Sequence, residues 1–105
     1  MRTTTGVPEL LTASFPAGFA LYDNYPNPFN PSTTIQFEMP MAAHISMKVF
    51  DTLGREVATV LDEFRTAGAG TVRFDASQYD IAGGVYFYRI QAGTFTQTKT
   101  MILVR

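Results

Sequence analysis

The chain has 105 residues, of which 46% are hydrophobic and 16% are charged, with a formal net charge of −1 and no cysteine. This length allows one domain with a small core, and the near-neutral charge without a basic patch argues against nucleic acid as a partner. No apolar run approaches the roughly 18 residues of a membrane-spanning helix, and disulfides and cysteine-based zinc sites are excluded.

Residues 1–18 are predicted to be a linker from an upstream domain. Threonine, proline and glycine interrupt any hydrophobic periodicity there. The first residues, Met1-Arg-Thr-Thr-Thr5, lack the apolar segment of a signal peptide. We therefore expect an export signal, if there is one, to lie on a longer precursor of which this chain is the C-terminal part.

A proline-rich segment comes next, here called the proline loop (residues 24–31). Its three prolines fix their own φ and push the preceding residues toward extended backbone. The segment is therefore predicted to be stiff and non-helical, and its isolated Phe29 is expected to fill an edge of the core. The loop consists of Asn24, Tyr25, Pro26, Asn27, Pro28, Phe29, Asn30 and Pro31.

Strand-sized runs separated by turn signals occupy the remainder of the chain. Asp51-Thr-Leu-Gly54 predicts a tight turn, because Asp suits its first position and Gly54 can adopt positive φ. Residues 62–65 are predicted to form one helical turn at most. This spacing favours an all-β fold, an antiparallel β-sandwich of six or seven strands over residues 19–105. The runs are 19–22, 33–39, 44–51, 55–61, 70–75, 85–91 and 94–104.

Tyrosines in the run 85–91 admit two interpretations. Tyr86, Tyr88 and Ile90 share one face of the strand, so they are predicted to face the core. The alternative is that Tyr86 and Tyr88, with Tyr79 in the preceding loop, form an exposed platform for sugars. The chain would then be a carbohydrate-binding accessory module of a secreted enzyme.

Residue types for catalysis and metal binding are sparse. His44 is the single histidine, and nothing marks a serine and an aspartate around it, so an exposed edge position is expected. Asp75 and Asp80 are expected to cap turn amides, with calcium binding as the alternative. We therefore predict no catalytic residues, no metal site, no cofactor and no enzymatic activity.

Several motifs resemble those of one known family. Leu21 to Ile35 looks like the opening of the type A C-terminal sorting domain of the bacterial type IX secretion system, with Asp23 where glutamine is commoner. Residues 49–57 are similar to the hairpin of that family, residues 84–90 to its Gly-x-Tyr strand and residues 99–105 to its last strand, with Thr100 where lysine is common. The related domain of the flagellar hook-cap protein lacks the proline-rich opening.

The resemblance implies an immunoglobulin-like domain that directs an upstream cargo across the outer membrane. It implies a passage through the periplasm to the cell surface or medium, with the outer-membrane secretion machinery and a sortase-like peptidase as partners. That peptidase would cut within residues 1–20. The last two strands are expected to carry the signal through an exposed edge, which also allows a weak homodimer. Outside the proline loop, the implied sorting residues are Gly84, Tyr86, Lys99, Met101 and Arg105.

Overall fold

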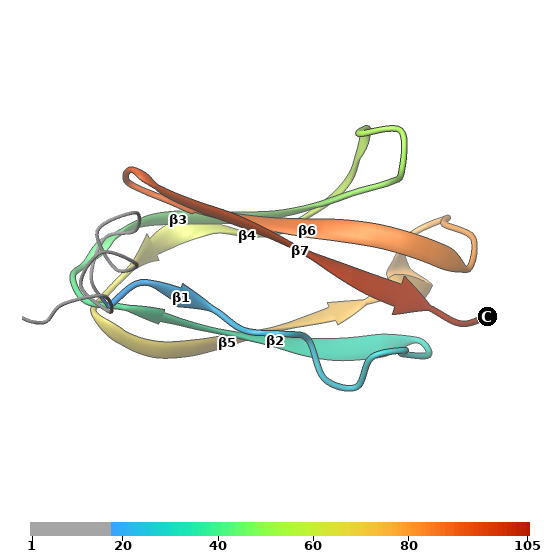
Figure 1. Ribbon diagram of the computed structural model, residues 1–105, viewed down its shortest axis with the longest axis horizontal. Helices are drawn as coiled ribbons and strands as arrows, with labels where there is room; N and C mark the ends of the chain where they lie inside the picture. Colours follow the sequence, from blue (N-terminus) through green and yellow to red (C-terminus); the bar gives the residue numbers. More distant parts are fainter. Residues whose placement is uncertain (1–17) are drawn as a thin grey trace, which may run out of the picture.

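The computed structural model describes residues 18–105, which form seven strands and one turn of 3₁₀ helix (Figure 1). The predicted linker falls almost wholly outside these residues. The strands lie close to the predicted runs. They are β1 (Ala20–Leu21), β2 (Ser32–Met39), β3 (Ala43–Phe50), β4 (Glu56–Arg65), β5 (Gly68–Asp75), β6 (Gly84–Ala92) and β7 (Phe95–Leu103), with the 3₁₀ turn η1 (Ala76–Gln78) after β5.

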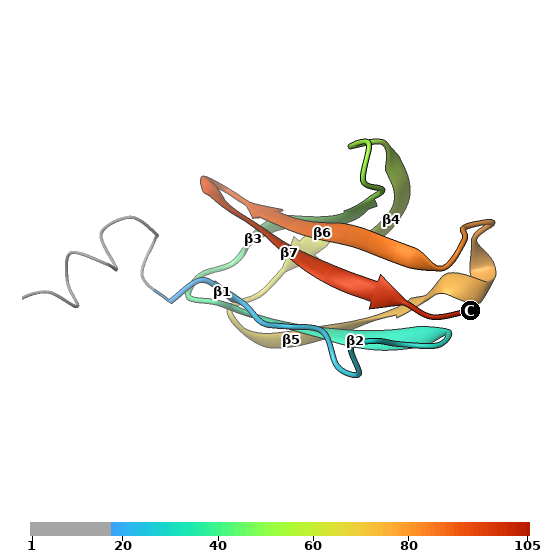
Figure 2. The ribbon, with the colours of Figure 1, turned by 45° about the vertical axis from the view of Figure 1, so that its right-hand side comes forward.

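Two antiparallel sheets face each other. One has three strands in the order β1-β2-β5, and the other has four in the order β4-β3-β6-β7. Both ribbon views place β1 and β7 along the same side of the sandwich (Figures 1 and 2). The prediction of an all-β antiparallel sandwich is confirmed, and β7 is an edge strand of its sheet.

The core follows from strict alternation along the inner strands. In β2 the buried side chains are Ile35, Phe37 and Met39, separated by exposed Gln36 and Glu38. Because side chains of a strand point alternately to its two faces, this pattern commits one face to the core. In β6 the buried side chains are Tyr86, Tyr88 and Ile90, so the prediction that these tyrosines face the core is confirmed.

The predicted turn between β3 and β4 is present. Asp51 Oδ1 accepts hydrogen bonds from the backbone N–H groups of Leu53 and Arg55, both at 2.9 Å, and Gly54 has a φ of 83°. The N–H of Arg55 lowers the pKa of the Asp51 carboxyl, since hydrogen bonds to the ionised form favour it. This side-chain geometry is the one that favours Asp in turns.

One prediction was wrong at the end of β4. Residues 62–65, expected to form a helical turn at most, continue the strand to Arg65, which lies opposite Ala43. A β-bulge between Met47 and Lys48 of β3 leaves an extra residue in β4. Because of the bulge, Ala58 and Leu61 are both buried although they are three positions apart in the sequence. This spacing of buried residues is typical of a helix.

Strand β5 also begins earlier than expected, at Gly68. Gly70, the first residue of the predicted run, lies opposite Phe37 in the ladder. A Cβ atom at Gly70 would lie 2.5 Å from the Phe37 ring, on which the Arg65 guanidinium also packs with a centroid distance of 5.6 Å. Glycine within a strand thus marks a close approach of a large side chain.

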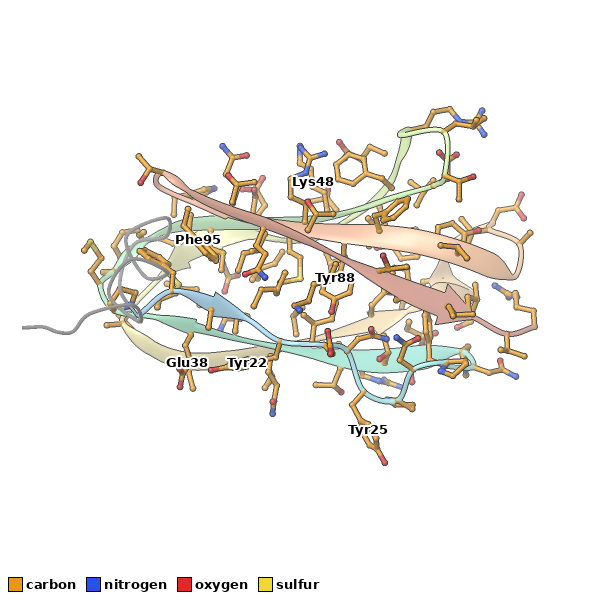
Figure 3. The ribbon with its side chains drawn as sticks, viewed as in Figure 1. Tyr22, Tyr25, Glu38, Lys48, Tyr88 and Phe95 are labelled. Carbon is orange, nitrogen blue, oxygen red and sulfur yellow. The ribbon has the colours of Figure 1, made fainter. Side chains whose placement is uncertain are left out.

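The Tyr88 hydroxyl lies between the sheets, as Figure 3 shows. It donates to the carbonyl of Tyr22 and accepts from the N–H of Asn24, both at 2.9 Å. Burial raises the pKa of Tyr88 to about 12, so the group stays neutral at physiological pH. The hydroxyl therefore satisfies two backbone groups where the chain leaves β1.

Replacing Tyr88 with Phe should destabilise the domain by about 1–3 kcal/mol, because the two backbone partners would remain buried without the hydroxyl. Chemical denaturation measures the loss. Tyr25→Phe is the matched control, since Tyr25 is 81% exposed, and it should change the free energy of unfolding by less than about 0.5 kcal/mol. Equal stability of the two variants would contradict the role given to the Tyr88 hydroxyl.

Candidate functional site

The first part of the proline loop is bonded to β2. The Asn24 side chain is buried, and its amide nitrogen donates to Thr33 Oγ1 at 3.0 Å and to the Pro26 carbonyl at 3.1 Å. Thr33 Oγ1 donates in turn to the same carbonyl at 2.8 Å. Tyr25 and Thr34 exchange two backbone hydrogen bonds at 2.9 Å. These bonds compensate for the donors that prolines lack.

The second part of the loop is bonded to the last strand. Asn27 Oδ1 accepts from the N–H of Ile102 at 3.0 Å. Phe29 donates its N–H to the Ile102 carbonyl and accepts from the N–H of Val104, both at 2.9 Å. The proline loop therefore joins the three-stranded sheet to the edge of β7, across 75 positions of sequence.

The Phe29 side chain is inside the sandwich, as predicted from its isolation between prolines. It is 2% exposed, and its ring meets Phe74 edge-on with a centroid distance of 6.0 Å. The loop ends at Pro31, whose carbonyl accepts from the N–H of Ala76 at 2.8 Å. Phe29 thus fixes the loop at the end of the sandwich where η1 follows β5.

The expected exposed edge of the final strand is covered in part, because the proline loop bonds to Ile102 of β7 and to Val104 just after it. Ladder groups alternate along a strand. Since Ile102 points its N–H and C=O away from β6, Thr100, Thr98 and Thr96 do the same in this unbroken register. Within residues 18–105 no partner bonds to those edge groups.

Three of the expected sorting residues lie where β6 meets β7. Tyr86 is opposite Met101 in the ladder, both are buried, and Gly84 is opposite Leu103. The Tyr86 hydroxyl donates to the Ala82 carbonyl at 2.5 Å. The side chains of Tyr86 and Met101 support the β6–β7 pair from inside and do not project from its surface.

The two basic residues at the end of the chain are engaged. An Nη atom of Arg105 donates to the Ile81 carbonyl at 3.0 Å and lies 3.5 Å from the Ala76 carbonyl. Lys99 Nζ lies 3.1 Å from Asp23 Oδ1, with the lysine side chain largely covered. Both basic side chains therefore already have partners within the domain.

Tyr25, Pro28 and Asn30 complete the expected sorting set, and all three side chains are exposed. No hydrogen bond within residues 18–105 connects them to β7. The expected set therefore contains residues that anchor the proline loop to β2 or β7 and residues, such as Pro28 and Asn30, whose side chains face solvent. Sequence reasoning missed Tyr88 and Asp23 as supports of this site, and no local pattern marks either pairing.

The alternative sites from the sequence differ in outcome. The sugar platform at Tyr86 and Tyr88 is wrong, because their side chains are 7% and 0% exposed. The expectation that Asp75 caps a turn is confirmed. Its Oδ1 accepts a hydrogen bond from the N–H of Ser77 at 2.9 Å. Hydrogen bonds from the Ser77 hydroxyl and amide lower the pKa of Asp75. His44 is on the surface as predicted, with Nε2 at 2.5 Å from Asp62 Oδ1.

The part of the chain that the structure describes holds no group of three or more His, Cys, Asp or Glu side chains placed to bind a metal ion. Over the same residues, no helix has the length and apolar character to cross a bilayer.

A comparison with protein families finds one match. The model of a family described as "Secretion system C-terminal sorting domain" matches residues 23–104. This span includes the proline loop and every strand except β1. No curated protein gives a significant match.

The Asn27 contact can be tested by amide exchange at Ile102. Asn27→Ala removes the acceptor, and a lost hydrogen bond of about 1 kcal/mol should speed exchange of the Ile102 amide roughly fivefold. Asn27→Asp keeps a carboxylate oxygen in the same place and should retain protection. NMR-detected exchange measures both, with the Tyr88 amide in β6 as internal reference. Unchanged exchange in Asn27→Ala would contradict the contact.

Proposed function

Because the chain belongs to the family of C-terminal sorting domains of the type IX secretion system, we propose that it directs a cargo attached upstream across the outer membrane. Membership by itself implies secretion to the cell surface or the extracellular space. The finer steps belong to the proposal. The domain folds in the periplasm, and the outer-membrane machinery binds the folded form. Its role is recognition, with no catalysis.

The recognition element is the open edge of β7 between Thr96 and Thr100. A partner strand can add to this edge through the backbone N–H and C=O groups that point away from β6. Exposed threonine side chains flank these groups. This observation carries the proposal, since the proline loop bonds to one end of the β7 edge and leaves the segment from Thr96 to Thr100 without a partner within residues 18–105.

The sorting residues fall into two roles. Asn24, Pro26, Asn27, Phe29 and Pro31 hold the loop that fixes the far end of β7. Tyr86 and Met101 support the β6–β7 pair from within, beside Gly84 at the start of β6. Lys99 and Arg105 tie β7 and the end of the chain to neighbouring loops. Tyr25, Pro28 and Asn30 are exposed and available to the machinery.

Removal of the domain forms the last step of the proposal. A sortase-like peptidase cuts within residues 1–20, ahead of the sandwich. Residues 1–17 lie outside the described part, so the support comes from the residues directly after them. Leu21 is a core residue, and the hydrogen bonds of Tyr22 and Asn24 begin just after it. A cut before Phe19 would leave all of these contacts intact.

The same open edge permits weak self-association. Two copies of β7 can pair antiparallel over the segment from Thr96 to Thr100, because each edge is its own complement. The short length of that segment limits the strength of the pairing. A high-concentration dimer would then compete with the machinery for the same groups.

Export of a fluorescent reporter tests the edge. The full chain is fused behind a reporter with a signal peptide, in a host with type IX secretion and in its export-channel mutant. Thr98→Pro removes one edge N–H, and edge strands tolerate proline. Thr98→Ala, the matched control, keeps that N–H. We expect Thr98→Ala to be exported like the parent and Thr98→Pro to be exported severalfold less.

Each result is interpreted with the folding of the purified variant, checked by thermal unfolding. A folded Thr98→Pro domain exported as well as Thr98→Ala would overturn the role of the edge and leave the sorting role in place. Reporter retained in the periplasm of the secreting host with the parent domain would overturn the sorting role itself. Export that persists in the channel mutant would do the same.

A further inference from the structure

The outer face of the three-stranded sheet carries a hollow that the sorting role does not use. It has a volume of about 390 Å³ and is lined by Tyr22, Gln36, Glu38 and Thr71, with Ala69 and Gly70 at its base. In Figure 3 Tyr22, Glu38 and Tyr25 project from this sheet away from the four-stranded sheet. The hollow therefore faces solvent on the side opposite the core.

Strand register explains how these side chains come together. Gln36 lies opposite Thr71, and the N–H of Tyr22 bonds to the Gln36 carbonyl at 3.0 Å. In the next row toward the proline loop, Tyr25 lies opposite Thr34. Side chains of alternate residues share one face of a sheet. The face thus has aromatic rings along its β1 side and hydroxyl, amide and carboxyl groups beside them.

The Tyr22 ring is held in place. Its hydroxyl donates to Glu38 Oε1 at 3.0 Å, and this hydrogen bond raises the pKa of Tyr22, so the ring stays neutral at pH 7. The side chain is nevertheless 43% exposed, and Tyr25 is 81% exposed. A positioned and partly exposed aromatic ring can bind a ligand at a lower entropic cost than a mobile one.

The chemistry of the lining excludes several kinds of partner. Strand β2 is bonded to β1 on one edge and to β5 on the other, so no peptide strand can add to β2 itself. The lining contains one acid, Glu38, and no base, which disfavours phosphates and other anions. The amide, carboxyl and hydroxyl groups disfavour an apolar helix, which would leave them buried without partners.

We propose that this hollow binds a neutral polysaccharide. Sugar rings combine an apolar C–H face, which packs on an aromatic ring, with hydroxyls that need both donors and acceptors. Tyr22 supplies the aromatic surface, while Gln36, Glu38 and Thr71 supply donors and acceptors around it. The hollow is open to solvent, which suits the side of an extended polymer.

The proposed sugar site is separate from the edge used for sorting. It lies on the outer face of β2 and β5, whereas the sorting edge belongs to β7 in the other sheet. The site also differs from the Tyr86 and Tyr88 platform, whose side chains are buried. The polysaccharide site would let the folded domain adhere to a glycan surface once outside the cell.

Affinity electrophoresis of the full chain tests the proposal, in native gels that contain dextran, mannan, laminarin, galactomannan or xylan. Retardation by at least one of these neutral polymers is expected. Tyr22→Ala and Gln36→Ala should each weaken binding about tenfold, the loss expected for one ring contact or one well-placed hydrogen bond. Phe64→Ala is the matched control, because Phe64 is an exposed aromatic on β4, and it should bind like the parent.

Two further gels, with dextran sulfate and with polylysine, separate sugar recognition from ion exchange. Retardation in these two alone would overturn the proposal, as would parental mobility in all five neutral gels. Binding that survives both Tyr22→Ala and Gln36→Ala would move the sugar site elsewhere. The Gln36→Ala variant should still be exported in the reporter assay, so failure of the sugar site and failure of the sorting role are distinguishable.

Discussion

The hydrogen bonds between the proline loop and the last strand are the interaction on which the rest of this structure depends. Prolines lack the backbone N–H, so a loop that contains three of them cannot be held by regular backbone pairing along its length. The loop is held by hydrogen bonds to other segments. Asn27 and Phe29 form these hydrogen bonds with the backbone of Ile102 and Val104. The loop that leads into β2 is thereby completed only when β7 is in place. Contacts of such long sequence separation carry a large loop-closure entropy, and they join the two ends of the domain into one unit.

This dependence has a functional consequence. The proline loop and the end of β7 lie at opposite ends of the domain in sequence, and they form one surface only in the folded state. A receptor that reads both would distinguish a folded domain from an unfolded one. The loop also shortens the open edge of β7, and a short free edge lowers the risk of aggregation. In the proposed mode of recognition, the contacts that hold β7 in place thus also limit the length of its free edge.

The two sheets offer different surfaces to partners. The four-stranded sheet offers backbone groups at the edge of β7. The outer face of the three-stranded sheet offers side chains, because its central strand is bonded on both sides. Backbone recognition gives strength with little sequence discrimination, whereas side chains such as Tyr22 and Gln36 discriminate by shape and hydrogen bonding. One small sandwich can therefore serve two kinds of contact without competition between them.

Local patterns in the sequence were enough to predict the fold class, most strand positions, the Asp51 turn and the burial of Phe29, Tyr86 and Tyr88. Alternation and turn chemistry act over a few residues, so they can be recognised without a structure. Alternation failed where a bulge broke it in β4, and it did not reveal that β5 begins at Gly68. Only the tertiary structure decided which part of β7 is covered, that Arg105 and Lys99 are engaged, and that Tyr22 and Glu38 form a hollow with Thr71. Each of these depends on segments that are distant in sequence, and their pairing is determined by the packing of two sheets rather than by any local preference.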